Sequence, residues 1–277
     1  MRKDQREPGI PVPEAESATG ARLGPMNGMA RPAAERLASG RTAPLDRPTR
    51  RLYLLRHGEA AYFDDRGKAL DPWAAPLTER GRRQVGQVAA RMTASGIERI
   101  VTSAVPRALE TASILADRLG LAPVADEAWN EIRPGDLAAI PDHQLRSVVV
   151  DAYRNAASPG ARFFGGELFS DFAGRVDRGL DRLLADPSWT TLAVVTHDPV
   201  ARYVIARALG LGLAGLRFFE QDDGCLNVID WAADPDGSVQ PIVRLINGTP
   251  ENLVKAGPRE PALVRFHRNY CASRGAP

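Results

Sequence analysis

The 277-residue chain has little of what marks disulfide-linked, zinc-binding or membrane-spanning proteins. It has only two cysteines, Cys225 and Cys271, and they lie too far apart in the sequence for a metal-binding or redox motif. No apolar run approaches the ~20 residues needed to cross a bilayer. The first fifty residues also lack the apolar stretch of a secretory signal. We therefore expect a cytoplasmic protein with two reduced thiols and no membrane association.

The chain also has almost no excess of charge of either sign. Its 36 basic and 34 acidic residues leave a formal charge of +2, which gives no reason to expect a nucleic-acid or membrane partner. Hydrophobic residues make up 44% of the chain, enough to bury a substantial core. This length allows one large α/β domain or two small ones.

Aromatic residues are absent from residues 1–50, where proline recurs among glycine, alanine and arginine; the first aromatic residue is Tyr53. A segment with so little to bury cannot offset its conformational entropy. We therefore predict a disordered N-terminal extension over residues 1–50 and a folded catalytic domain over residues 51–277. The extension could be a docking arm, but its composition favours an inert segment.

From residue 51 onward, short β-like runs alternate with amphipathic helical patterns. The pattern predicts a helix capped by Thr78, another running from Pro106 to Gly120, and a third ending near Gly210. A further helix is predicted over residues 168–183, and strands over residues 51–55, 97–101, 192–195, 225–231 and 242–246. Such alternation predicts a three-layer α/β/α sandwich around a mixed, mainly parallel sheet.

Polar side chains suited to phosphate follow three of these strands. Arg56 and His57 end the first, the second leads through Ser103 to Arg107, and His197 ends the strand over residues 192–195. Ligands of such sheets bind beyond the carboxyl ends of the strands, so we expect these side chains to converge.

These residue types suit phosphoryl transfer. A neutral imidazole is nucleophilic at neutral pH, and guanidinium groups bind phosphate oxygens in a bidentate fork. Helix starts near Pro106 and Pro199 would direct free backbone N–H groups at the same anion. The leaving alkoxide also needs a proton, and Glu131 is the candidate acid.

The motifs, in this order, strongly resemble those of the histidine phosphatase superfamily, the phosphoglycerate mutase-like phosphatases. The resemblance covers about residues 51–254, and its first motif is Leu-Leu-Arg-His-Gly-Glu at residues 54–59. The other matching segments are residues 76–84, 102–112, 130–135, 165–167, 194–197 and 245–249.

The resemblance implies a metal-independent, acid-type phosphatase without a cofactor. His57 would be the nucleophile that forms a phosphohistidine, and Glu131 the general acid and base. Arg56, Arg107 and His197 would hold the phosphate of a small phosphorylated metabolite.

Two other glutamates compete for the role of the acid. We expect Glu59 to orient a neighbouring group and Glu167 to cap a helix, which leaves the role to Glu131.

Three positions depart from the family pattern. Ala60 and Phe63 stand where many relatives have Thr and Asn, so a side-chain contact to the phosphate or substrate is expected to be missing. Asp198 follows the second histidine, where glycine is frequent. We expect Asp198 to cap a helix, although its charge could instead select a cationic or hydroxyl-rich substrate.

Residues 136–165 could form a small cap over the site or a surface excursion, and we slightly favour the cap. The side chains expected to touch the leaving group are Arg133, Arg146, Arg162, Phe163 and Phe164. Trp73, in the loop over residues 63–76, is a second candidate lid residue. His143 and His267 are expected to face solvent, His267 within a polar tail.

Two other functions use the same residues. A phosphoglycerate-type mutase would return the phosphoryl group to its substrate instead of to water, and the short segment before residue 165 favours hydrolysis by leaving the site open. A non-catalytic phosphate-binding module would have lost the nucleophile or the acid, and this chain keeps both.

Overall fold

The predicted alternation of strands and helices is present in the computed structural model. The structure describes residues 49–274 except residues 65, 67, 69, 234–238, 258 and 259. The predicted extension over residues 1–50 therefore lies outside the described residues except for its last two. The first strand begins at Arg50, one residue before its predicted start.

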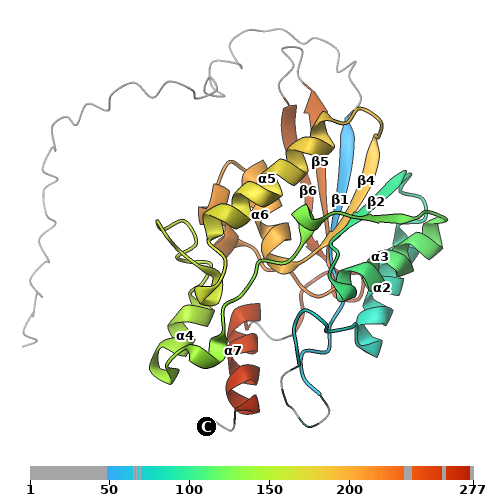
Figure 1. The fold of residues 1–277 in the computed structure, drawn as a ribbon. Coiled ribbons are helices and arrows are strands. Elements are labelled where there is room, and N and C mark those ends of the chain that lie inside the picture. The colour runs from blue at the N-terminus through green and yellow to red at the C-terminus, as the bar shows by residue number, and fades with distance from the viewer. Residues whose placement is uncertain are drawn as a thin grey trace, which may run out of the picture. The chain divides into compact units, whose positions relative to one another are not determined.

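A six-stranded mixed sheet runs through the described residues, in the order β3-β2-β4-β1-β5-β6 (Figure 1). The first four strands in this order are parallel, whereas β5 pairs antiparallel with both β1 and β6. The mainly parallel sheet is thus confirmed. The strands are β1 (Arg50–Arg56), β2 (Arg99–Thr102), β3 (Pro123–Ala125), β4 (Thr191–Thr196), β5 (Leu226–Ala233) and β6 (Val239–Gly248).

Helices cover both faces of the sheet, which confirms the three-layer sandwich (Figure 1). One face carries α2 (Glu79–Arg91) and α3 (Pro106–Leu119), and the other carries α5 (Phe169–Ala185) and α6 (Asp198–Ala208). Beyond the sheet, α4 (Asp142–Val150) packs against α7 (Ala262–Ser273). The 3-10 turns are η1 (Glu127–Trp129), η2 (Leu137–Ala139), η3 (Phe163–Gly165) and η4 (Gly212–Phe218).

Among the described strands and α-helices, three were not predicted from the sequence: β3, α4 and α7. Residues 262–273 form a helix, not a polar tail, so His267 is half-buried on α7 and its predicted exposure is wrong. His143 is exposed on α4, as predicted.

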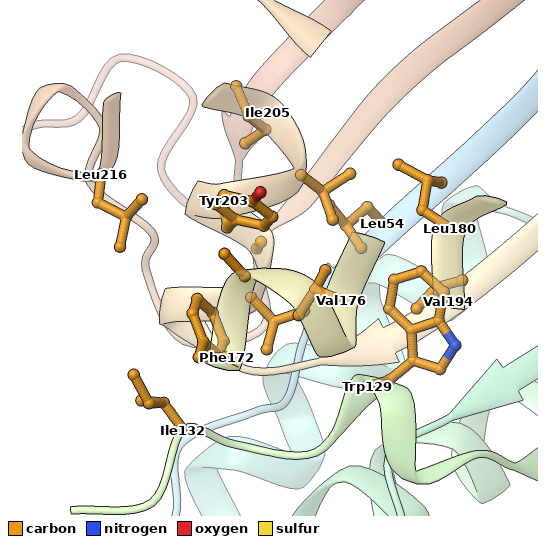
Figure 2. Close-up of a cluster of buried hydrophobic side chains, with 14 of the residues drawn as sticks. Leu54, Trp129, Ile132, Phe172, Val176, Leu180, Val194, Tyr203, Ile205 and Leu216 are labelled. Atoms are coloured by element: carbon orange, nitrogen blue, oxygen red, sulfur yellow. The ribbon is translucent and has the colours of Figure 1, made fainter. Parts of the chain in front are cut away.

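Alternation along the central strands separates two hydrophobic cores. Leu54 and Val194 point into the core beneath α5 and α6, where Figure 2 shows them near Val176. The next residues, Leu55 and Val195, enter the core formed with α2 and α3. Successive side chains of a strand point to opposite faces, so both central strands are apolar throughout.

No single described helix is long and apolar enough to span a bilayer, and α6 and η4 reach that length only together, across a bend of 118°.

Local signals fix the ends of the helices beside the site. The Thr78 hydroxyl accepts a hydrogen bond from the Gly81 N–H at 3.0 Å and caps α2, as predicted. Gly120 ends α3 in the left-handed conformation, at φ 69°. Gly58 lies so close to α2 that a Cβ there would come within 2.5 Å of the Gly81 carbonyl oxygen. Glycine at position 58 therefore lets the end of β1 approach α2.

Two glycines of α5 provide a matched test of how this helix packs. A Cβ at Gly179 would lie 2.6 Å from Ala128 Cβ, whereas a Cβ at Gly174 meets nothing closer than 3.4 Å. Both Gly→Ala changes share a helix-propensity gain of ~1 kcal/mol. We expect Gly179→Ala to be less stable than Gly174→Ala by about 1–3 kcal/mol, the cost of overpacking. Urea unfolding of both variants measures the difference, and equal stabilities would contradict the close approach of Gly179 to Ala128.

Candidate active site

Three strand ends meet in register at one edge of the sheet. Arg56 of β1 lies beside Thr196 of β4, and Thr102 of β2 lies beside Val195. The ladder continues one step further, because the His57 N–H donates to the Thr196 carbonyl at 2.9 Å and the Ser103 N–H to the Val195 carbonyl at 3.0 Å. His57, Ser103 and His197 therefore leave adjacent strands at the same level. The predicted convergence at the carboxyl ends is present.

His57 is buried and held in one tautomer. Its Nδ1 lies 2.7 Å from the Gly58 carbonyl oxygen, which can only accept, so Nδ1 carries the proton. Its Nε2 accepts from Arg107 Nε at 3.0 Å, and a guanidinium can only donate. Burial, followed by the charges of Arg107 and Arg56, holds the pKa of His57 well below its ordinary value. The ring is therefore neutral, with a lone pair on Nε2.

Arg107 lies in the first turn of α3 and contacts the His57 ring. Its Nη1 donates to the Pro72 carbonyl at 2.6 Å, and its Nη2 lies 3.4 Å from Glu131 Oε2. The Tyr62 ring lies 5.5 Å from its guanidinium carbon. The guanidinium is thus fixed in place beside the imidazole lone pair.

The two terminal nitrogens of Arg56 are hydrogen-bonded or ion-paired, whereas its Nε has no partner among the described residues. Its Nη1 donates to the Gln221 carbonyl at 2.6 Å, and its Nη2 pairs with Asp223 at 2.9 Å. Arg56 Nε is buried without a hydrogen-bond partner among the described residues. A buried N–H without an acceptor is energetically costly, and a bound anion would provide the missing acceptor.

His197 faces His57 with its ring centroid 5.1 Å away, and its tautomer is also set by its neighbours. The Ser103 hydroxyl donates to Asn130 Oδ1 at 2.9 Å, so at 2.8 Å it accepts from His197 Nε2. This leaves Nδ1 to face Glu131 Oε2 at 3.5 Å. Burial, followed by the charge of Arg107, lowers the pKa of His197 well below its ordinary value.

Glu131 is the acidic member of the cluster. Burial raises its pKa to about 7, and the charge of Asp198 adds to the rise while Arg107 opposes it. Its Oε1 accepts from the Ile132 N–H at 3.0 Å, and its Oε2 faces Arg107 and His197. Near neutral pH a large fraction of this carboxyl group carries a proton, as a proton donor requires.

The two competing glutamates are engaged elsewhere. Glu59 accepts from the Thr78 hydroxyl at 2.8 Å and pairs with Arg80 at 3.0 Å, so it orients the start of α2. Glu167 accepts from the Arg133 N–H at 2.8 Å and pairs with Arg175 at 3.3 Å. The predicted capping role of Glu167 is wrong, because α5 begins after Leu168 without a side-chain cap.

Asp198 does not cap its helix either, which corrects a second prediction. The cap position of α6 is His197, and Asp198 is the first helical residue. One of its oxygens pairs with Arg202, and the other accepts from the Tyr153 hydroxyl at 3.0 Å. The charge of Asp198 is thus compensated within the protein, and its tie to Tyr153 connects α6 to residues 136–165.

The cluster contains side-chain atoms that could ligate a metal ion, but the positive charges around it are those of an anion-binding site. His57, Glu131 and His197 offer ligand atoms that all lie within 4.8 Å of one another. The guanidinium of Arg107, however, donates to the His57 nitrogen that a metal would need, and Arg56 adds a second positive charge. Two fixed cations repel a metal ion and attract phosphate, so the arrangement favours an anion.

A cavity of about 360 Å³ extends outward from Arg56, Arg107 and Glu131. Trp73, Phe163 and Phe164 line it, as the cap hypothesis expects. The prediction for the three cap arginines is wrong, because they do not line the cavity and their side chains are exposed: Arg133, Arg146 and Arg162.

Sequence reasoning missed the side chains that hold the site residues in place. Ser103 and Asn130 fix His197, and Asp223 fixes Arg56. Ser103 had a usable signal, since it follows a strand at the same level as the two histidines. Asp223 had none, because it reaches Arg56 from a loop more than 160 residues further along the chain.

The family assignment follows from comparison of the whole chain with known proteins. A model of the histidine phosphatase superfamily, branch 1, matches residues 52–239. The chain belongs to this superfamily. Membership makes it an enzyme of the phosphatase or phosphoglycerate mutase type and confirms the resemblance of its motifs.

Individual relatives include both types of enzyme. A Yersinia pestis protein named probable phosphoglycerate mutase GpmB is 30% identical over 191 residues, covering 66% of this chain and 86% of the relative. The α-ribazole phosphatase structure from Shigella flexneri is 25% identical, with a TM-score of 0.57, and covers 72% of this chain and 96% of that one. A mycobacterial glucosyl-3-phosphoglycerate phosphatase, 23% identical with a TM-score of 0.62 over 72% of this chain and 100% of that one, shares the fold.

The raised pKa of Glu131 predicts a change of stability with pH. Between its ordinary value of 4.5 and about 7, the folded chain holds a proton on Glu131 that the unfolded chain has lost. The contribution of this group to stability therefore falls as pH rises through that range. A glutamine at position 131 does not titrate. The unfolding free energy of Glu131→Gln minus that of wild type should therefore rise by about 2–3 kcal/mol from pH 5 to pH 8.

Denaturant unfolding at both pH values measures this change. Glu59→Gln is the control, because it keeps Glu131 and should retain the decline. A difference between Glu131→Gln and wild type that is independent of pH would contradict the raised pKa.

Proposed function

We propose that this chain is a phosphomonoester hydrolase that acts on a small phosphorylated metabolite through a phosphohistidine on His57. The observation that carries the proposal is the single tautomer of His57. Gly58 holds its Nδ1 proton, while Nε2 presents a lone pair beside Arg107. A neutral imidazole in a cationic pocket can attack an anionic phosphate without a metal ion.

In the first step, Arg107 Nε exchanges its hydrogen bond to His57 Nε2 for one to a phosphate oxygen, and the freed lone pair of Nε2 attacks phosphorus as the bond to the ester oxygen breaks. Arg107, Arg56 Nε and His197 would hold the non-bridging oxygens. The negative charge of the bound phosphate would raise the pKa of His197, so that Nδ1 takes up a proton from solvent and donates it in a hydrogen bond to a phosphate oxygen. The protonated carboxyl of Glu131 gives its proton to the leaving oxygen, which departs as an alcohol. The bond from Nδ1–H to the Gly58 carbonyl oxygen stabilises the positive charge that develops on the phosphorylated ring.

In the second step, water attacks the phosphorus of the phosphohistidine. Glu131, now a carboxylate, takes a proton from this water as the P–N bond breaks. The electron pair of that bond returns to Nε2, and inorganic phosphate leaves. The proton taken up regenerates the acid for the next cycle.

A mutase is the second candidate, because the Yersinia relative is named as a probable phosphoglycerate mutase. Both reactions share the phosphohistidine and differ in whether water or the dephosphorylated substrate receives the phosphoryl group. A mutase needs a bisphosphorylated primer to load His57, whereas a phosphatase does not. We favour hydrolysis, since the cavity opens from Glu131 toward solvent-exposed segments and leaves room for water.

His57→Asn tests the nucleophile. We expect wild type to release phosphate from an aryl phosphate without a primer and after dialysis against a chelator. The variant should lower kcat/KM roughly a thousandfold or more, because no side chain remains to accept the phosphoryl group. His143→Asn, on the exposed surface of α4, is the matched control and should keep the wild-type rate.

Unchanged turnover in His57→Asn would refute the phosphohistidine. Turnover that depends on a bisphosphorylated primer would identify a mutase. No turnover by wild type on any phosphate ester would leave a phosphate-binding module.

Glu131→Gln tests the acid. The variant should lower kcat/KM about 10²–10⁴-fold for an alkyl phosphate, whose leaving group needs a proton, and much less for a nitrophenyl phosphate. With wild type, kcat/KM for the alkyl phosphate should fall as pH rises above about 7, because Glu131 then loses its proton. Steady-state assays across pH measure both effects, with Glu59→Gln as control. Equal slowing of the two substrates by Glu131→Gln would move the acid role to another group.

A further inference from the structure

The cavity beyond the phosphate end has a wall of near-parallel aromatic rings. Five rings follow one another, each with its centroid 3.9–6.2 Å from the next and tilted by 13–21°. Their order is Tyr153, Phe163, Phe164, Phe266 and Tyr270, and all five line the cavity. Offset-stacked rings at such distances attract one another and present a broad apolar surface.

The backbone is strained to place one of these rings. Phe164 has φ 51°, a left-handed conformation that a bulky residue rarely adopts, and it lies in the middle of the stack. Such conformations are typical of ligand-binding sites, where the surrounding structure maintains them. Tyr62, Phe63 and Trp73 add three more rings to the lining.

The last two rings of the stack belong to α7, a helix beyond the residues that the family model matches. That match ends at residue 239, whereas Phe266 and Tyr270 come from Ala262–Ser273. Glu220 ties the start of α7 to the site, because its Oε2 accepts from Arg202 at 3.1 Å and from the Ala262 N–H at 3.3 Å. Arg202 in turn pairs with Asp198, next to His197. The helix is therefore anchored to the base of the cavity.

Among the described residues that line the cavity, the positively charged side chains lie at the phosphate end, and the other side chains that can carry a charge near neutral pH are acidic. Arg56 and Arg107 are its only cations among the described residues, and both face the phosphate position. Of the three acidic side chains in the lining, Glu131 is substantially protonated near neutral pH and Asp198 is paired with Arg202, which leaves the negative charge of Asp136. A second anionic group on the substrate would find no further cation in the described lining and would meet the charge of Asp136.

From these observations we propose that the cavity binds the organic part of the substrate as an apolar or aromatic group without a second negative charge, with α7 as one wall. The substrate class is thus a phosphate monoester of a bulky apolar or aromatic alcohol. This inference rests on the proposed function for the phosphate end. A volume of about 360 Å³ suits a group of this kind.

Alkylphosphonates test the cavity without needing turnover, because their P–C bond is not hydrolysed. We expect the Kd of the wild-type full chain to fall by roughly threefold per added methylene from methyl- to hexylphosphonate, as each group leaves water. A terminal carboxylate on the same chain, as in 6-phosphonohexanoate, should raise Kd about tenfold or more by cancelling part of this burial. Isothermal titration calorimetry measures the series.

Phe266→Ala tests the role of α7, with Phe218→Ala as the matched control. Phe218 is 59% exposed on η4 and does not line the cavity. Phe266→Ala should weaken hexylphosphonate binding about five- to tenfold and leave methylphosphonate binding unchanged, because only the longer ligand reaches the ring. Phe218→Ala should leave both unchanged.

Two results would overturn the proposal: affinities that do not rise with chain length in wild type, or a 6-phosphonohexanoate that binds as tightly as hexylphosphonate. If Phe266→Ala binds hexylphosphonate as tightly as wild type, α7 is not a wall of the site.

Turnover of the corresponding alkyl phosphates separates this inference from the proposed function. If phosphate is released but affinity does not change with chain length, apolar binding in the cavity is refuted and the phosphatase activity stands. If affinity rises with chain length but no phosphate is released, the phosphatase activity is refuted and apolar binding stands.

Discussion

Two guanidinium groups and two neutral imidazoles share one small buried space, and the rest of the site is arranged around this concentration of donors. Burial and the nearby guanidinium charges keep both histidines uncharged, and their neighbours fix which nitrogen of each ring carries the proton. The same burial pushes the neighbouring carboxyl of Glu131 toward its protonated form. One environment therefore keeps a neutral imidazole and a substantially protonated carboxyl side by side, the states that the proposed nucleophile and acid require and that two exposed side chains would not both hold near neutral pH.

This environment depends on the register of the sheet. His57 and His197 continue the pairing of β1 with β4, and Ser103 continues that of β2 with β4. A slip of one residue would turn each of these side chains toward the opposite face. The hydrophobic alternation that separates the two cores thus also fixes the positions of the reacting groups.

The parts of the fold predicted from the sequence are those with local signals. Thr78, Pro106 and Gly120 mark helix ends by capping chemistry, and the apolar runs of the central strands are long enough to stand out. The convergence of Arg56, His57, Arg107 and His197 followed from the rule for carboxyl ends of parallel strands. The missed features depend on tertiary contacts. Helix α7 packs against α4, and Glu167 pairs with Arg175 eight residues further along the chain. The pairing of Asp198 with Arg202 differs, because its i,i+4 spacing was visible in the sequence. Helix-capping preferences alone could not foresee those partners.

The phosphate end and the aromatic wall come from different parts of the chain. Strand ends and the starts of α3 and α6 form the phosphate end, whereas η3, the residues before it and the C-terminal helix form the wall. Two links join them: Tyr153 of the wall donates to Asp198, and Glu220 connects Arg202 to the start of α7. Changes at Tyr153 or Glu220 would therefore reach the residue next to His197, whereas changes at Phe266 or Tyr270 would alter the wall alone.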